Sequence, residues 1–168
     1  MLAPDTHPGT RPGTQPGTHD ELLPVSWRSR PGDFVSLMTL YESNYVRLRD
    51  LAPHLKTLQG EQVSMVAGDC PLYLRVDEHC RYTTTFTLTY LFDTVAGVIA
   101  DPDLQVRVYH DARAAEVLHC ARWHRHDVLS SLKSALYRQL GDRWLRNVML
   151  NKWLDYCAER GHRFAAQT

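Results

Sequence analysis

The sequence lacks an excess of either charge, because 19 lysines and arginines balance 19 aspartates and glutamates over 168 residues. A chain without net charge has no overall field that would attract nucleic acid, an anionic membrane or an acidic partner. Any function that depends on charge must therefore come from a local patch. Specific signals for nucleic-acid binding are also missing.

Cysteines are few and irregularly spaced. The four cysteines form no CxxC pair, so neither a zinc ribbon nor the disulfide framework of a secreted protein is indicated. We expect reduced thiols at Cys70, Cys80, Cys120 and Cys157.

Long apolar runs are absent as well. No stretch approaches the roughly 18 uninterrupted apolar residues that span a bilayer, and residues 1–20 lack the basic and apolar regions of a signal peptide. These absences predict a cytoplasmic protein with no membrane partner. No Walker loop, GxGxxG, HExxH or GxSxG motif occurs, so we expect no cofactor and favour a non-enzymatic role over an enzymatic one.

The first 32 residues differ in composition from the rest, with the triplet Pro-Gly-Thr starting at Pro8, Pro12 and Pro16. Such a segment has little to bury, and its prolines lack backbone donors, so residues 1–32 are predicted to be a disordered tail. Residues 33–164 are predicted to form a single α+β domain, and residues 165–168 a flexible C-terminus. A domain of about 130 residues can bury roughly two thirds of its unfolded surface without a disulfide or a metal. Whether the tail belongs to the mature protein stays open.

Two segments have the three- and four-residue apolar spacing of amphipathic helices. The first follows Asp33, a suitable N-cap, and is predicted to end near Pro53; the second is predicted to stop at Gly161. Their apolar positions are Phe34, Leu37, Met38, Tyr41, Tyr45, Leu48 and Leu51, and then Trp144, Leu145, Val148, Met149, Leu154 and Cys157. A further short helix is possible between Val128 and Leu140.

Between these helices the apolar residues alternate with polar ones, which is typical of β-strands. Strands are expected at Val63–Ala67, Leu72–Asp77, Arg81–Phe92, Leu104–Tyr109 and Ala115–Ala121, with a loop from Ala96 to Asp103. Short connections favour antiparallel neighbours. The predicted fold is α+β: an N-terminal helix, a five-stranded, mostly antiparallel meander sheet and a C-terminal helix packed on one sheet face.

Four stretches together resemble one known family. They are Glu42-Ser-Asn-Tyr-Val-Arg-Leu with Leu51 and Pro53, Arg81-Tyr-Thr-Thr, Val106-Arg-Val-Tyr-His-Asp-Ala with Ala115-Glu-Val, and Trp153-Leu-Asp-Tyr-Cys with Gly161. In order and spacing they resemble the YqiB-like family of uncharacterised gram-negative bacterial proteins, a family with a domain of unknown function. The resemblance implies no established activity. The chain departs from that family in its Pro-Gly-Thr tail and in His119, His124 and His126.

The polar face of the predicted sheet supplies the first candidate site. Arg75, Arg81, Arg107 and Tyr109 all fall on the non-core positions of their strands, beside a row of threonines. Arginine forks bind phosphate or carboxylate, so these residues are predicted to bind an anionic ligand such as a nucleotide or an acidic protein surface. The alternative is an ordinary solvated sheet face, which needs polar residues in any case.

A second candidate site gathers around one predicted hairpin. His110, Asp111 and Glu116 would supply an imidazole and two carboxylates, enough for acid-base catalysis in a small hydrolase. The alternative places His110 at the core edge and makes Asp111 a turn residue.

Two other hypotheses remain. Cys120, His124 and His126 offer a thiolate and two imidazoles for zinc, against the alternative of a polar segment after the last strand. An unpaired edge strand or an exposed tryptophan face would make the protein a homodimer or a partner-docking protein. Glu42 and Asn44 are expected to reach toward the arginines of the sheet.

Overall fold

The computed structural model describes residues 33–120 and 141–165. The predicted tail, the possible helix at 128–140, and His124 and His126 lie outside the described residues. In chain order the elements are α1 (Phe34–Leu51), β1 (Glu61–Ser64), β2 (Leu72–His79), β3 (Thr83–Thr94), β4 (Gly97–Tyr109), β5 (Ala114–His119) and α3 (Asp142–Arg160). Among the described residues, neither helix is both long and apolar enough to cross a membrane.

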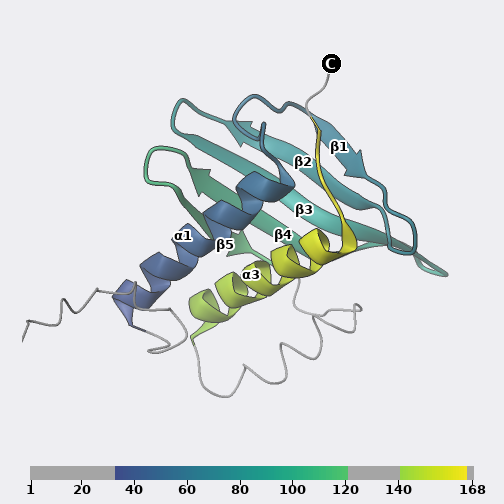
Figure 1. Cartoon of the computed structure of the whole chain (residues 1–168). Coiled ribbons are helices and arrows are strands. Elements are labelled where there is room, and N and C mark those ends of the chain that lie inside the picture. Colours follow the sequence, from purple (N-terminus) through teal and green to yellow (C-terminus); the bar gives the residue numbers. More distant parts are fainter. Residues whose placement is uncertain (1–32, 121–140, 166–168) are drawn as a thin grey trace, which may run out of the picture.

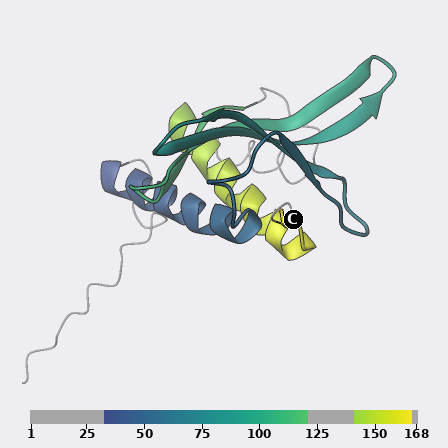
Figure 2. The same cartoon turned by 90° about the horizontal axis from the view of Figure 1, so that it is seen from above.

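The strands form one sheet in the order β1-β2-β3-β4-β5, with every neighbouring pair antiparallel (Figure 1). The helices α1 and α3 lie side by side against one face of this sheet, as both views show (Figures 1 and 2). The predicted α+β fold with its meander sheet is therefore confirmed.

The helix ends follow the predicted capping signals. The Asp33 side chain accepts a 2.6 Å hydrogen bond from the backbone N–H of Ser36, which satisfies a donor that the first turn of α1 leaves unpaired. At the other end of the chain, Gly161 adopts φ 88°, a left-handed conformation that glycine takes without strain, and terminates α3.

The core lies between the sheet and the helices. Successive residues of a strand face opposite sides of the sheet, so residues at alternate positions share one face. The apolar residues of β2, β3 and β4 occupy alternate positions and point toward α1 and α3. Trp153 of α3 is fully buried and packs edge-on against Tyr90 of β3, with ring centroids 4.8 Å apart. Trp144 and Trp153 are thus core residues, as expected for aromatic residues at helical spacing, and the alternative of an exposed tryptophan face does not hold at these two positions.

The predicted loop from Ala96 to Asp103 is wrong. In the structure β3 and β4 stay paired as far as Thr94 and Gly97, so only two residues form the turn. Three residues of this segment are turn formers, Gly97, Pro102 and Asp103. The strand pair accommodates them through the glycine's φ of 118° and a register irregularity opposite Thr89. The extra length makes a two-stranded arm, residues 91–100, that projects beyond the sheet (Figure 2).

The first strand also ends earlier than predicted. It stops at Ser64, before Met65 and Ala67, because its pairing with β2 closes at Ser64 and Leu72. The Ser64 hydroxyl accepts a 3.0 Å hydrogen bond from the backbone N–H of Arg163, so the end of this strand is attached to the segment that follows α3.

Candidate functional site

The structure does not gather the predicted anion-binding arginines. Arg75 on β2 lies opposite Thr87, whereas Arg107 on β4 lies opposite Thr85, so the two belong to different rows of the sheet. Arg81 follows β2 in the connection to β3, where its guanidinium lies 5.0 Å from the centre of the Tyr82 ring. Only Arg107 and Tyr109 are close neighbours, two residues apart on the same strand.

The two strand arginines already have acidic partners. The Arg75 Nε atom lies 3.1 Å from Asp77, and the Arg107 Nη2 atom lies 3.4 Å from Glu78. A β-bulge between Val76 and Glu78 produces the second pair, because it turns Glu78 from the core face to the outer face. This outer face is therefore largely neutralised by its own carboxylates.

The predicted hydrolase residues are not joined by hydrogen bonds to one another. The Asp111 carboxylate accepts a hydrogen bond from the N–H of Ala112, which is the turn role considered as its alternative. Glu116 accepts hydrogen bonds from the hydroxyls of Tyr109, at 2.7 Å, and Tyr41, at 3.2 Å. Burial, followed by the charge of Glu116, raises the pKa of Tyr41 to about 12, so this phenol stays neutral.

Cys120 is half-buried at the end of the described segment, and its predicted metal-binding partners His124 and His126 are outside it. Within residues 33–120 and 141–165, no group of three or more metal-binding side chains gathers.

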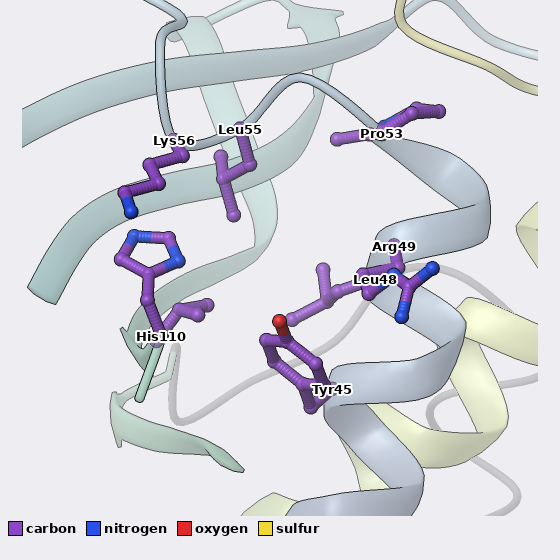
Figure 3. A pocket seen from close by; sticks show the side chains of 9 residues that line it. Tyr45, Leu48, Arg49, Pro53, Leu55, Lys56 and His110 are labelled. Atoms are coloured by element: carbon purple, nitrogen blue, oxygen red, sulfur yellow. The ribbon is translucent and has the colours of Figure 1, made fainter. Parts of the chain in front are cut away.

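His110 instead lines a pocket of about 270 Å³ between α1, the loop after it and the end of β4 (Figure 3). We call it the α1–β4 pocket. Its lining comprises Tyr45, Leu48, Arg49, Ala52, Pro53, Leu55, Lys56, Val108 and His110.

Local chain signals position the walls of this pocket. Pro53 disfavours the helical conformation in the residue before it, and α1 ends at Leu51. The following turn is closed by a 3.0 Å hydrogen bond from the N–H of Leu58 to the carbonyl of His54, and it is anchored by the buried side chains of Leu55 and Leu58. This anchoring carries the exposed Lys56 to a position across from His110 (Figure 3).

The charges of the pocket all have one sign. Arg49 and Lys56 are its cationic side chains, and no carboxylate is part of the lining. In the part of the chain that the structure describes, neither cation forms an ion pair, whereas Arg47 is held by Asp155 at 2.5 Å and Arg160 by Asp69 at 3.3 Å.

His110 is held in place by neighbouring strands. Its Nε2 atom lies 2.8 Å from the Thr84 hydroxyl, which lies 3.2 Å from Nδ1 of His79, and its backbone N–H donates to the carbonyl of Tyr82. Burial lowers the pKa of His110, and the nearby charges of Lys56 and His79 lower it further, while Asp111 opposes them. The imidazole is therefore neutral at neutral pH.

The structure also reveals a buried polar cluster that the sequence analysis missed. His162 contacts Ser64 through Nδ1 at 3.2 Å and Asp69 through Nε2 at 3.3 Å. This order of groups resembles a serine hydrolase triad, but Ser64 is only 5% exposed and its hydroxyl already accepts a hydrogen bond from Arg163. The cluster attaches the segment after α3 to β1. Its members lie far apart in the sequence, so no local pattern of residues indicated it.

Asn44 does not reach the arginines of the sheet. It is buried between the helices, where its Oδ1 atom accepts a 2.9 Å hydrogen bond from Asn151 and its Nδ2 atom donates to the carbonyl of Asn147. Asn147 in turn accepts a 3.0 Å hydrogen bond from the backbone N–H of Val117 on the edge strand β5. These asparagines hold α1, α3 and β5 together and lie away from solvent.

Comparison with known proteins identifies the family. The chain matches the family model described as "Protein of unknown function (DUF1249)" over residues 47–163, a segment that contains every lining residue of the α1–β4 pocket except Tyr45. It is 31% identical over 129 residues to "Uncharacterized protein YqiB" of Escherichia coli strain K12, covering 77% of this chain and 91% of that protein. The proteins of the same name from E. coli O6:H1 and O157:H7 match equally. No solved structure matches the chain. The chain therefore belongs to the DUF1249 family, as its resemblance to YqiB-like proteins predicted.

Proposed function

We propose that this protein binds a small anionic ligand in the α1–β4 pocket. The observation that carries the proposal is the pair of cations, Arg49 and Lys56, in a lining without carboxylates. An anion is the ligand class that a concave site of this charge attracts. The sequence-based hypothesis of an anion-binding protein is kept, but its site moves from the sheet face to this pocket.

The nearby C-terminus of α1 does not reverse the positive charge of the pocket. The pocket lies by the C-terminus of α1, where the helix dipole contributes about half a negative charge. Two full positive charges outweigh that contribution. The Tyr45 hydroxyl and the His110 ring add hydrogen-bonding groups to the lining.

The rest of the lining selects for a partly apolar ligand. Leu48, Leu55 and Val108 give the pocket an apolar floor, and contact with it removes apolar ligand surface from water. Pockets for drug-sized ligands run from roughly 300 to 1,000 Å³, so a volume of about 270 Å³ fits a small organic anion better than a large cofactor.

Calorimetric titration at low salt with phenyl phosphate, phenyl sulfate and benzoate tests the proposal. We expect at least one of these anions to bind, and the double variant Arg49→Gln/Lys56→Gln to weaken that binding by on the order of a hundredfold. The matched control is Arg75→Gln/Arg107→Gln, which also removes two positive charges but outside the pocket, and it should bind nearly as well as wild type. Failure of all three anions to bind, or an equal loss in both double variants, would contradict the proposal.

A second candidate function is self-association through the projecting arm. Four large apolar side chains of the arm are exposed, at Leu91, Val95, Val98 and Ile99, on its two faces and its turn, and exposed apolar surface favours association. Light scattering on the purified protein should then show a dimer, and Val98→Thr/Ile99→Thr should shift it to the monomer while keeping strand propensity. A monomer at the highest soluble concentration would contradict this candidate.

A further inference from the structure

The two ring nitrogens of His110 have different surroundings. The Nε2 atom is 2.8 Å from the hydroxyl of Thr84, whereas Nδ1 makes no hydrogen bond with a residue that the structure describes. Figure 3 shows one ring nitrogen turned toward the Lys56 ammonium and the other turned toward the hollow of the pocket. A ligand in the hollow can therefore meet a ring nitrogen that the protein itself does not occupy.

Thr84 connects this half-buried ring to a second, exposed histidine. Its hydroxyl lies between Nε2 of His110, at 2.8 Å, and Nδ1 of His79, at 3.2 Å. A hydroxyl can donate one hydrogen bond while it accepts another, so the three groups form a chain along which a proton can move. Because His79 is exposed, this chain begins in water and ends at the pocket.

The protein's own groups around His110 keep its ring neutral. Lys56 from the loop and His79 from β2 disfavour a positive ring, and so does burial; the charge that favours it comes from Asp111 in the turn after β4. From α1, the Tyr45 hydroxyl points toward the same hollow, while the positively charged Arg49 guanidinium lies beyond Leu48, farther from His110 (Figure 3). A bound ligand with two negative charges would reverse this balance.

We propose that the ligand is a phosphate monoester, and that its binding places one proton from solvent on His110, so that Nδ1–H donates a charge-assisted hydrogen bond to the phosphate. The inference rests on the proposed anion-binding function and makes it specific. A dianionic phosphate matches the two cations of the lining in charge, and one of its three terminal oxygens can accept from Nδ1–H of His110. A carboxylate has one charge, so it leaves one of the two cations without a counter-charge.

Proton uptake makes the affinity depend on pH in a specific way. The affinity should rise as pH falls from about 8 toward about 6, because His110 must be protonated in the complex, and fall below the second pKa of the phosphate at about 6. A sulfate monoester carries a single fixed charge and should bind more weakly with little proton uptake.

Calorimetry in two buffers of different ionisation enthalpy measures the protons taken up on binding. At about pH 7.5, where a phosphate monoester is mostly dianionic, the wild-type protein should take up close to one proton per bound phenyl phosphate. His110→Gln should abolish this uptake and weaken binding by roughly ten- to a hundredfold. His54→Gln removes an exposed imidazole from the same loop outside the lining and should change neither quantity.

A second measurement needs no variant. The ring signals of His110 in the NMR spectrum of the wild-type protein should move to imidazolium positions when phenyl phosphate is added, and should stay neutral with phenyl sulfate. Binding of phenyl phosphate without proton uptake, uptake that persists in His110→Gln, or equal affinity for the two esters would overturn the inference. If benzoate or phenyl sulfate still binds through Arg49 and Lys56, the proposed function survives that result; if none of the three binds, both fall.

Discussion

The molecule has two regions rich in basic side chains, and they differ in what neutralises them. On the outer face of the sheet, Arg75 and Arg107 lie beside Asp77 and Glu78. In the α1–β4 pocket, the lining provides no carboxylate for Arg49 and Lys56. The number of basic residues is similar in both regions, so their number does not indicate binding. What distinguishes the pocket is positive charge in a concave site without a partner from the protein.

The sharpest way to break this comparison is to reverse one charge in each region. Lys56→Glu should weaken phenyl phosphate binding by on the order of a hundredfold, because an attractive group worth about 1.5–3 kcal/mol is replaced by a repulsive one. Arg75→Glu reverses a charge on the outer face of the sheet and should leave the titration unchanged. Equal losses in the two variants would mean that the anion responds only to the net charge of the protein.

A substitution in the buried cluster should affect stability and not binding. Asp69→Asn removes an acceptor used by Tyr90, Arg160 and His162 and should lower the free energy of unfolding by about 1–3 kcal/mol near neutral pH. Denaturant unfolding measures the loss, and phenyl phosphate titration of the folded variant should match wild type. Weaker binding in a fully folded Asp69→Asn variant would show that the cluster and the pocket are coupled.

The pH dependence of that loss has a definite sign. Burial opposes ionisation of Asp69, but hydrogen bonds from Cys70, Tyr90 and His162 outweigh it and lower the pKa of the carboxyl. A group whose pKa is lowered in the folded state stabilises the protein above its unfolded pKa and loses that effect as pH falls through its folded pKa. The difference in stability between wild type and Asp69→Asn should therefore shrink in acid.

The sheet face can be made to resemble the pocket by removing a carboxylate. Asp77→Asn should leave Arg75 available to anions and create weak, salt-sensitive phosphate binding on the sheet. The cost in stability should stay below about 1 kcal/mol, because Arg75 is largely exposed and exposed ion pairs contribute little. Titration of Asp77→Asn in the Arg49→Gln/Lys56→Gln background isolates the new site, and a flat titration there would contradict the interpretation of the sheet face as self-neutralised.

Salt should produce the smallest effect. Raising the ionic strength from about 0.01 M to about 0.15 M shortens the screening length from about 30 Å to about 8 Å, so phenyl phosphate should bind several-fold more weakly. Contacts at hydrogen-bond distance in a pocket are screened less than distant charges, so binding should persist. Complete loss of phenyl phosphate binding at the higher ionic strength would indicate that the pocket attracts the anion without contacting it directly.

Much of the fold could be predicted because its signals are local. The alternation in β2, β3 and β4 and the apolar stripe of α3 each follow from one short segment. Asp33 marks a helix start by its side-chain acceptor, and Gly161 marks a helix end because it has no side chain and adopts a left-handed conformation without strain. The predicted loop from Ala96 to Asp103 is wrong because turn-forming residues are compatible with a strand when the strand pair contains a bulge.

The candidate site was only partly predictable. His110 was singled out as a possible catalytic residue, but with Asp111 and Glu116, which are its neighbours in sequence. Its partners in the structure, Thr84 and Lys56, come from β3 and from the loop after α1. No spacing rule connects segments so far apart in the chain.

The sequence by itself determined the α+β class, the antiparallel character of the sheet and most of the core, because periodicity and capping act within a few residues. Only the tertiary structure decided which charges meet. The bulge beside Asp77 brings Glu78 to Arg107, and the turn after Pro53 carries Lys56 to His110 without an acidic partner. Electrostatic interactions depend on distance through space, and the register of the sheet and the packing of the loop set that distance.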